Sequence, residues 1–408
     1  MREKYGKSPR SYSESIKAIS DNLCNRCQSD YLIYDIYGRL TCPDCHAVEG
    51  ETLYRFFREI ESRKHILKFP FELSQEQEKG SSFLLELIKN GQNGILHAVC
   101  GAGKTEMTYA GIIYALNHEM KICFAIPRKE IVIELSKRFK TYFPSTTIKA
   151  LHQNNKDDEG AQLVISTIHQ LINYLHEFDL IILDEADAYP YAFNEYLKRL
   201  VHKALRPGGI LIQMSATIDP NEIDVCNANY HLSPSRFHNG FLDEPQFIQV
   251  ENIKTMIKTN KIPETITQIL DRWIKNNLSV FLFVPTISIG LCLARIMKQA
   301  GYKSDNISSA SWNKDNCLRD FQRKRTDIMI TTTILERGVT FKNVQVGVLY
   351  SDALIFTKSV LIQICGRVGR FKDYPSGEIC FFSEYVSKAM IEARKEIRQL
   401  NKMIRDRE

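Results

Sequence analysis

The residues with the clearest chemistry lie in one stretch, ILHAVCGAGKT, which runs from Ile95 to Thr105. An apolar run breaks into Gly101-Ala102-Gly103 and is followed at once by Lys104 and Thr105, the order of a strand, a glycine turn and a helix start. Glycines let backbone N–H groups point inward, and the helix adds its positive N-terminal end, so such a turn can hold phosphate. Lys104 would bridge the outer phosphates, and the Thr105 hydroxyl would bind Mg²⁺. A chance glycine-rich turn is the alternative until the context supports a nucleotide site.

An acidic group follows a second apolar run. The run DLIILD ends in Asp184-Glu185-Ala186-Asp187, and acidic residues at the carboxyl end of a parallel strand lie where such sheets bind ligands. Asp184 would hold Mg²⁺, and Glu185 would orient and deprotonate the attacking water. Acidic surface turns are common, but this one follows a phosphate-binding turn by a few βα units, which favours the catalytic interpretation.

Two arginines, Arg367 and Arg370, lie three residues apart in QICGRVGR. This spacing predicts that both lie on one helix face. A basic surface helix is the plain structural interpretation. The functional one is that arginines from a second lobe reach the γ-phosphate and stabilise the charge that develops in the transition state.

A helix is expected to open at LSQEQ, with Ser74 as N-cap and Gln77 as its capping-box partner. The Gln77 amide could instead read the edge of adenine, because its donor and acceptor suit that pairing. Its position about one helix before the phosphate turn favours adenine recognition over capping alone.

Four cysteines form two CxxC pairs, Cys24 with Cys27 and Cys42 with Cys45, close to the spacing of four-cysteine zinc sites. Two tight turns would present four thiolates to one Zn²⁺, and the segment between them reads as a hairpin that turns at Gly38. Metal binding would supply most of the folding energy of so small a unit. A redox dithiol is the alternative interpretation. The total of 11 cysteines is odd, which argues against a disulfide framework.

The elements that must position these residues alternate short apolar runs with amphipathic stretches, which indicates βα units and parallel sheets. We predict an α/β protein with two tandem RecA-like P-loop lobes and a small N-terminal four-cysteine zinc module. The expected segments are a mobile tail (1–20), the zinc module (21–50), a connector (51–72), the first, ATP-binding lobe (73–238), a linker (239–258), the second lobe (259–385) and a basic C-terminal helix (386–408).

The composition is that of a globular protein with a sizeable core, because 44% of the 408 residues are hydrophobic and 25% are charged. A net charge of +6 is a mild excess in the direction that favours a nucleic-acid partner. No apolar run reaches the roughly 18 to 20 residues that span a bilayer, and the N-terminus lacks the apolar core of a signal peptide. We therefore expect a cytoplasmic protein.

With these motifs in order, the chain resembles the superfamily 2 helicases of DEAD/DEAH type. AVCGAGKT, with Ala98 where the wider P-loop class has glycine, resembles motif I, and DEAD resembles motif II. IPRKE, SAT, TTTILERGVTF and QICGRVGR resemble motifs Ia, III, V and VI. With the cysteine module ahead of the lobes, the chain is most similar to the ComFA family of late-competence DNA-uptake ATPases. Gln363 and Thr340 stand where DEAD-box RNA helicases usually have histidine and aspartate, so DEAD alone does not predict an RNA helicase.

The resemblance implies an ATP-driven single-stranded DNA translocase or helicase in the uptake of transforming DNA. It implies ATP, Mg²⁺ and Zn²⁺ as cofactors and gives the residues named above their roles. The resemblance also implies competence proteins and a membrane DNA channel as partners. It is compatible with a homo-oligomer and with a location at the cytoplasmic face of the membrane. Ser215 and Thr217 are expected to couple the DEAD turn to the cleft. An RNA helicase and an ATP-gated, zinc-containing adaptor are the alternatives.

Strand contacts in such lobes go mainly to phosphate and sugar, which makes binding tolerant of sequence and sensitive to salt. The candidates for these contacts are Arg128, Lys129, Thr167, Thr286 and Thr332.

Overall fold

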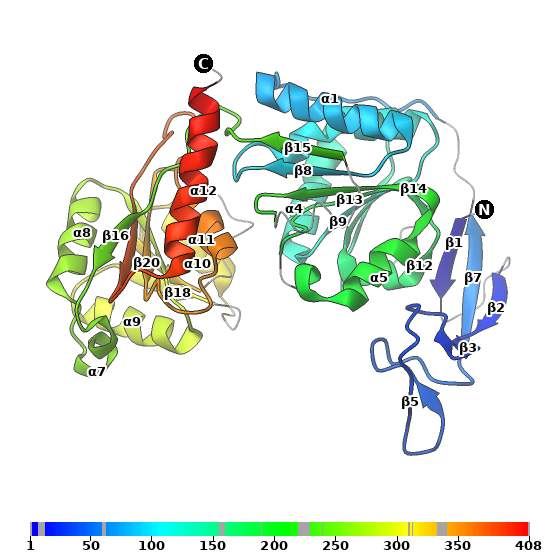
Figure 1. The fold of residues 1–408 in the computed structure, drawn as a ribbon, viewed down its shortest axis with the longest axis horizontal. Coiled ribbons are helices and arrows are strands. Elements are labelled where there is room, and N and C mark those ends of the chain that lie inside the picture. The colour runs from blue at the N-terminus through cyan, green and yellow to red at the C-terminus, as the bar shows by residue number, and fades with distance from the viewer. Residues whose placement is uncertain are drawn as a thin grey trace. The chain divides into compact units, whose positions relative to one another are not determined.

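The structure is a computed structural model, which describes residues 2–6, 13–58, 63–153, 155, 160–188, 190–218, 229–238, 240–308, 311, 313–332 and 341–406. Its contacts divide the chain into two compact units (Figure 1). The first unit holds Met1–Ala98 and Lys104–Ser233, and the second holds Val99–Gly103 and Pro234–Glu408. Each unit has a main sheet and a hydrophobic core of its own.

The main sheet of the first unit is parallel. Its strands are β8 (Gly94–Ala98), β9 (Ile122–Ile126), β10 (Ile148–Leu151), β11 (Leu163–Thr167), β13 (Phe178–Leu183), β14 (Leu205–Ser215) and β15 (Asn229–Ser233). Over the described residues their order is β10-β11-β9-β13-β14-β8-β15. β8, β9 and β11 are buried along their whole length, as expected of parallel strands covered on both faces. The order places β14 between β8 and β13, the strands that lead into the phosphate turn and the DEAD turn.

Helices of the first unit connect these strands, as the alternating pattern predicted. They are α1 (Gln75–Asn90), α2 (Lys104–Met107), α3 (Tyr109–Asn117), α4 (Lys129–Tyr142) and α5 (Glu195–Ala204), with the short 3-10 helices η1 (Ile168–Asn173) and η2 (Tyr191–Phe193). α1 packs against β8 and β15, whereas α5 packs against β14 and η1. The alternation of strands and helices therefore builds the sheet edge that carries the motifs.

A small antiparallel sheet lies beside this lobe and contains the N-terminus. It consists of β1 (Arg2–Gly6), β2 (Ser13–Lys17), β7 (Thr52–Arg58) and β12 (Tyr174–Leu175), in the order β12-β1-β7-β2. Residues 2–6 and 13–17, in the segment expected as a tail, form strands, and so do residues 52–58 of the expected connector. The physical reason is that β1 pairs with β7 and β12, far along the chain, and local composition does not reveal such pairing.

The cysteine module carries two short hairpins. β3 (Ile19–Ser20) pairs with β4 (Leu23–Cys24), and β5 (Ile33–Tyr34) pairs with β6 (Leu40–Thr41). The second hairpin turns through Gly38 at a φ of +74°, which confirms the predicted turn. The four cysteines share one apolar cluster with residues of the first lobe such as Tyr174 and Leu200, so the module packs onto that lobe.

The main sheet of the second unit is also parallel. Its strands are β16 (Gln246–Gln249), β17 (Ser279–Phe283), β18 (Ser304–Ile307), β19 (Ile328–Thr331), β20 (Val344–Leu349) and β21 (Ile379–Ser383). In the described part of the chain their order is β16-β21-β20-β17-β19-β18. Two parallel sheets with flanking helices confirm the predicted α/β fold with two tandem lobes.

The helices of the second unit are α8 (Glu264–Lys275), α9 (Ile287–Gln299), α10 (Lys314–Gln322), α11 (Lys358–Cys365) and α12 (Lys388–Arg405), with the short η3 (Ile253–Thr255) and α7 (Met256–Thr259). The segment expected as a linker contains β16, η3 and the start of α7, and β16 pairs with β21 and extends the sheet. The basic C-terminal helix is α12, which packs against α11 and buries an apolar face. Its charges lie on the remaining surface.

Candidate nucleotide and metal sites

The phosphate turn has the predicted strand, turn and helix. β8 ends at Ala98 and α2 begins at Lys104. Gly101 and Gly103 have φ angles of +85° and +78°, in the left-handed region that glycine adopts without strain. The Lys104 ammonium donates a hydrogen bond to the Ala98 carbonyl at 2.9 Å, which holds its charge over the start of the turn.

The DEAD turn follows β13 and is strained. The Asp184 N–H bonds to the Ala125 carbonyl of β9 at 2.9 Å, and the Glu185 N–H bonds to Asp184 Oδ1 at 2.8 Å. Glu185 has a φ of +54°, an uncommon conformation for a residue other than glycine and one that concentrates at functional sites. The turn therefore fixes the backbone of the two acidic residues that the sequence assigns to the metal and the base.

Burial raises the pKa of Asp184 to about 6, and the Lys104 charge opposes that shift. The carboxylates of Glu185 and Asp187 raise it further. The structure thus brings Lys104 and the DEAD carboxylates into one electrostatic environment. A partly buried, acidic oxygen ligand of this kind suits Mg²⁺, and a divalent cation there would offset the repulsion among the carboxylates.

Motif III is bonded to the DEAD turn, as its expected coupling role requires. The Thr217 hydroxyl donates to the Asp187 carboxylate, and the Thr217 N–H donates to Ser215 Oγ at 3.0 Å. The Ala186 N–H also bonds to the Met214 carbonyl at the end of β14. A displacement of either segment would therefore move the other.

His97 is a polar contact of this edge that the sequence analysis passed over. It lies within the buried strand β8, where Nδ1 bonds to the Tyr230 hydroxyl at 2.8 Å and Nε2 lies 3.2 Å from the Ala216 carbonyl. The residue ties the strand of the phosphate turn to motif III. A histidine inside an otherwise apolar run is the signal that could have found it.

Gln77 is buried in the first turn of α1 and forms the predicted capping box. The Ser74 N–H donates to Gln77 Oε1 at 3.0 Å, and the Gln77 N–H donates to Ser74 Oγ at 3.4 Å. Capping is confirmed, and adenine recognition by the same amide stays a prediction.

Motif VI differs from the expectation of two arginines on one helix face. α11 ends at Cys365, so Arg367 and Arg370 lie in the turn that follows it. Gly366 caps the helix, and Gly369 further along the turn has a φ of +66°, in the left-handed region. Arg367 is buried, and Arg370 Nε donates to the Gly366 carbonyl at 2.6 Å.

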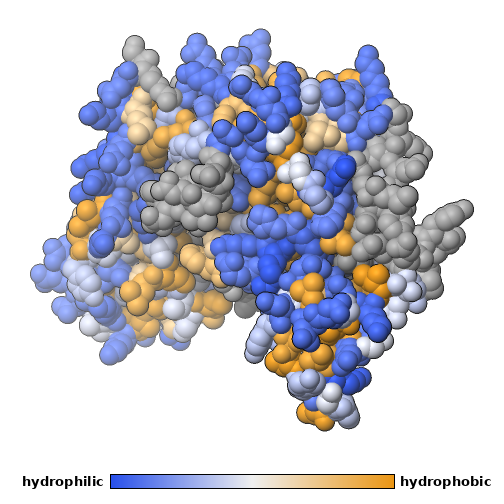
Figure 2. Space-filling model, turned by 45° about the vertical axis from the view of Figure 1, so that its right-hand side comes forward, coloured by the Kyte–Doolittle hydropathy of each residue, from blue (hydrophilic) through white to orange (hydrophobic). Residues whose placement is uncertain are grey.

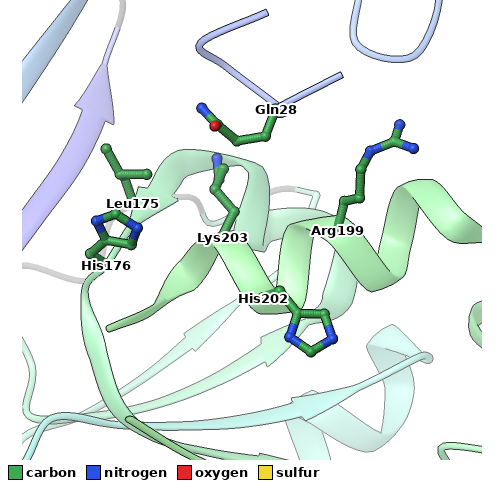
Figure 3. A pocket seen from close by; sticks show the side chains of 6 residues that line it. All are labelled: Gln28, Leu175, His176, Arg199, His202 and Lys203. Carbon is green, nitrogen blue, oxygen red and sulfur yellow. The ribbon is translucent and has the colours of Figure 1, made fainter. Parts of the chain in front are cut away.

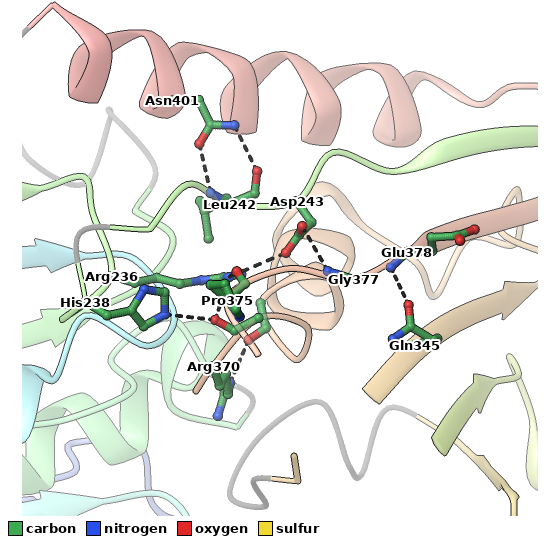
Figure 4. A network of polar contacts seen from close by, with 12 residues as sticks. Arg236, His238, Leu242, Asp243, Gln345, Arg370, Pro375, Gly377, Glu378 and Asn401 are labelled. Carbon is green, nitrogen blue, oxygen red and sulfur yellow. Dashed lines mark hydrogen bonds and ion pairs between the residues drawn. The ribbon is translucent and has the colours of Figure 1, made fainter. Parts of the chain in front are cut away.

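A polar cluster around the buried Arg236, made of Arg236, His238 and Asp243, holds the motif VI turn and is called the motif VI clamp below (Figure 4). Arg236 Nη1 donates to the Gly369 carbonyl at 2.8 Å and lies 3.4 Å from Asp243 Oδ2. His238 Nε2 lies 3.0 Å from the same Gly369 carbonyl. Burial raises the pKa of Asp243, and the Arg236 charge opposes the rise. Asp243 Oδ1 also accepts from the Gly377 N–H at 3.2 Å.

The segment that carries the clamp is joined to α12 as well. Asn401 accepts a hydrogen bond from the Leu242 N–H and donates one to the Leu242 carbonyl, both at 2.9 Å (Figure 4). No sequence motif marks these residues. They come together because the segment that begins at Pro234 folds as part of the second unit.

The four cysteines converge as predicted. Their sulfur atoms all lie within 4.8 Å of one another and all four side chains are buried. Cys24 and Cys45 are 3.4 Å apart, and Cys27 and Cys42 are 3.5 Å apart. Four thiolates at these separations fit one tetrahedral Zn²⁺.

Two basic side chains of α5 fasten the cysteine module to the first lobe. Lys203 Nζ donates to the carbonyls of Arg26 and Ile172, each at 2.7 Å, and Arg199 pairs with Asp44. At this seam lies a cavity of about 240 Å³ (Figure 3). It is lined by Gln28, Leu175, His176, Arg199, His202 and Lys203.

The predicted strand-contact residues lie at the carboxyl ends of neighbouring strands. In the first unit, Arg128 and Lys129 follow β9, and Thr167 ends β11. In the second unit, Thr286 follows β17 and caps α9, and Thr332 follows β19. Within each unit the topology thus gathers the candidates at one sheet edge, and their contacts with nucleic acid stay predictions. The rest of motif V, residues 333–340, lies outside the described residues.

Comparisons with known proteins agree with this geometry. The family described as "Type III restriction enzyme, res subunit" matches residues 70–220, and the helicase conserved C-terminal domain matches residues 261–372. A solved structure of S. cerevisiae Dbp5 bound to RNA and ADP BeF3 shares the fold, with a TM-score of 0.56 and 17% identity over 81% of this chain and 92% of that chain. The two matched domains on this fold define an ATP-dependent helicase or translocase of superfamily 2.

Two relatives identify the family within superfamily 2. Competence protein ComFA of Bacillus subtilis is 37% identical over 93% of this chain and 86% of its own length. Competence protein ComFA of Streptococcus pneumoniae is 34% identical over 93% of this chain and 90% of its own length. The chain belongs to the ComFA family. The helices within the described ranges include none that has the length and apolar character to cross a membrane.

Proposed function

We propose that the chain is an ATP-driven motor that moves along single-stranded DNA and serves the uptake of transforming DNA. The observation that carries the proposal is the pair of turns on one parallel sheet: the phosphate turn after β8, where Lys104 is held on the Ala98 carbonyl, and the DEAD turn after β13, where Asp184 holds the Glu185 N–H. A phosphate-binding lysine beside a metal-binding carboxylate is the arrangement that hydrolysis of a nucleoside triphosphate needs.

In this proposal the phosphate turn, the DEAD turn and Gln77 bind and orient the nucleotide. Backbone N–H groups of Gly101, Ala102 and Gly103 hold the phosphates, and Lys104 neutralises their charge. Thr105 and Asp184 would hold Mg²⁺, which supplies positive charge to the phosphate oxygens when it is bound. Gln77 reads adenine.

Glu185 accepts the proton of the attacking water, and Asp184 fixes its backbone through the bond to the Glu185 N–H. Arg367 and Arg370 of motif VI would stabilise the negative charge that develops on the γ-phosphate. Thr217 reports the state of the DEAD turn through its hydrogen bond to Asp187.

The motor moves along the strand if ATP binding and hydrolysis switch the protein between two conformations that bind the strand with different affinity. The strand-contact candidates of both units would hold phosphate and sugar, so that binding is salt-sensitive and tolerant of sequence. DNA is favoured over RNA because both curated ComFA relatives are named competence proteins, a role concerned with DNA, and because Gln363 replaces the motif VI histidine of RNA helicases. Other competence proteins and a membrane DNA channel are the proposed partners, which would place the motor at the cytoplasmic face of a membrane.

The test compares ATP hydrolysis by the purified chain with single-stranded DNA, duplex DNA and RNA of equal length. We expect single-stranded DNA to stimulate the rate most, and the Glu185→Gln variant to show no stimulated turnover with any of them. Greater stimulation by RNA would instead support an RNA helicase. No stimulation by any nucleic acid would reject the motor and favour an ATP-gated adaptor.

A further inference from the structure

The outer hairpin of the cysteine module exposes an unusual run of apolar side chains. Its tip, defined here as residues 31–37, is described throughout and holds five exposed large hydrophobic residues. The exposed fractions are 64% for Tyr31, 43% for Ile33, 73% for Tyr34, 91% for Ile36 and 76% for Tyr37. Single exposed apolar residues are normal on a protein surface, but a contiguous group marks a surface that binds something.

The hairpin projects from the rest of the first unit, at the place labelled β5 in Figure 1. Cys24, Cys27, Cys42 and Cys45 lie at its base and pack on the lobe, so the tip is carried by a fixed support. Nothing in the described part of the first unit covers it, as the exposed fractions show.

The turn at the tip is held in one conformation by its own polar groups. Asp35 Oδ1 accepts from the N–H groups of Tyr37 at 2.8 Å and Arg39 at 2.9 Å. The Arg39 guanidinium pairs with Asp35 Oδ2 at 2.8 Å and lies 5.4 Å from the centre of the Tyr37 ring. The polar groups are therefore used inside the turn, and the apolar side chains are left to face outward in a preorganised array. Such rigidity lowers the entropy cost of binding.

Charge decides between the classes of partner. Residues 28–51 contain five carboxylates and one arginine, in a chain whose net charge is +6. The carboxylates belong to Asp30, Asp35, Asp44, Glu49 and Glu51. Asp35 pairs with Arg39 and Asp44 pairs with Arg199, so the exposed acidic groups are Asp30, Glu49 and Glu51. Surfaces that stack the bases of single-stranded nucleic acid are positively charged along the backbone track, and this one is acidic. Anionic membranes likewise recruit basic, not acidic, protrusions.

A second copy of the chain is also disfavoured, because a symmetric contact through two tips would bring their carboxylates together. What remains is a different protein. The tip presents exposed tyrosine and isoleucine side chains, and acidic residues surround them. Such a surface is complementary to an apolar pocket whose rim is basic.

We propose that the hairpin tip is the docking site for a partner protein that presents an apolar pocket with a basic rim. Ile36 and Tyr37 fill the pocket, and the exposed carboxylates of Asp30, Glu49 and Glu51 face the rim. The proposal does not depend on which nucleic acid the motor follows, because the tip carries none of the residues assigned to ATP or to the strand.

The test places a photo-crosslinking amino acid at position 36 of the full chain in competent cells, and at position 354 as a matched control. Leu354 is 99% exposed in the second unit, so it reports adducts formed by exposure alone. The protein captured at position 36 is then identified and purified, and its affinity for the full chain is measured directly. Ile36→Ser, Tyr37→Ser and Leu354→Ser are compared with the unchanged chain.

We expect one discrete protein at position 36 that is absent from position 354. Its affinity should fall about tenfold or more with Ile36→Ser or Tyr37→Ser, since apolar anchors dominate such interfaces, and should not change with Leu354→Ser. Raising salt from about 0.1 M to 0.5 M should weaken it, because the rim contacts are charged. Zinc content and DNA-stimulated ATP hydrolysis of the two hairpin variants should stay at the level of the unchanged chain, which shows that they fold.

Several results would overturn the proposal. The first is the absence of a protein adduct at position 36. The second is an adduct with nucleic acid, lipid or a second copy of the chain. The third is a purified partner that binds both hairpin variants as tightly as it binds the unchanged chain. If zinc content falls in both variants, Tyr34→Ser takes their place, and unchanged binding there would overturn it equally.

Discussion

Replacing Arg236 by methionine should unfold the second unit at a much lower temperature. The Arg236 side chain is fully buried and Asp243 is 14% exposed, so the change leaves a carboxylate without its partner in a place with little water. Breaking a buried pair in this way costs about 3 to 5 kcal/mol. Methionine keeps the apolar stem, so the loss comes from the charge and from the bonds to the Gly369 and Pro375 carbonyls.

For a unit of this size each kcal/mol shifts the melting temperature by about 2 to 4 °C. We therefore expect Arg236→Met to lower the melting temperature of the second unit by about 6 to 20 °C. Amide exchange over residues 366–378 should rise with it, because the Gly377 N–H is bonded to Asp243. Adding Asp243→Asn should restore part of the stability, since it removes the unpaired charge.

The matched control is Arg325→Met, which breaks the pair of Arg325 with Asp320. Their side chains are 66% and 41% exposed, and surface pairs contribute about 0 to 1 kcal/mol. The reasoning is refuted if Arg236→Met melts within about 2 °C of the control, by the same conversion, or if exchange over residues 366–378 is unchanged.

Four further outcomes are expected. Glu185→Gln should lower ATP turnover by about 100-fold or more, as loss of a general base does, while ATP binding measured by equilibrium titration is retained; unchanged turnover would remove Glu185 from the mechanism. Burial raises the pKa of Asp184 to about 6, so the carboxylate gains a proton as the pH falls through that value. The Mg²⁺ concentration for half-maximal hydrolysis should therefore be roughly tenfold higher at pH 5 than at pH 7. An Mg²⁺ requirement that is the same at both pH values would contradict this. Gln77→Glu preserves the capping acceptor but removes the amide donor, so it should raise the KM for ATP and not for GTP at unchanged melting temperature, and equal KM changes would leave capping as its only role. Protein purified without chelators should contain about one zinc per chain, as one tetrahedral four-thiolate site requires, and Cys27→Ser should lose it; metal-free protein by elemental analysis would reject the site.

The parts of the molecule that sequence predicts well are those set by local spacing. The glycines of the phosphate turn and the two CxxC pairs are defined by residues within a few positions of one another, and the backbone angles and sulfur separations agree with them. The buried apolar runs likewise predict the parallel strands that bring the DEAD turn beside the phosphate turn.

The parts that sequence reasoning missed depend on contacts between distant residues. β1 gains its structure from pairing with β7 and β12, so its polar composition alone suggested a tail. Arg236 meets Gly369 across 133 positions, and no local pattern distinguishes it from a surface arginine. The helix predicted through motif VI ends at Cys365 for a local reason, because two glycines lie between Cys365 and Arg370 and glycine destabilises a helix interior.

The central claim, movement along single-stranded DNA, is tested most directly by timing the arrival of the motor at a fluorescently labelled strand end. On strands of increasing length, the delay before the signal should grow in proportion to length with ATP and vanish for Glu185→Gln. Each end is labelled in turn, so either direction of travel is detected. A signal that rises without a length-dependent delay at both ends, or that is the same for the unchanged chain and Glu185→Gln, would contradict a translocating motor.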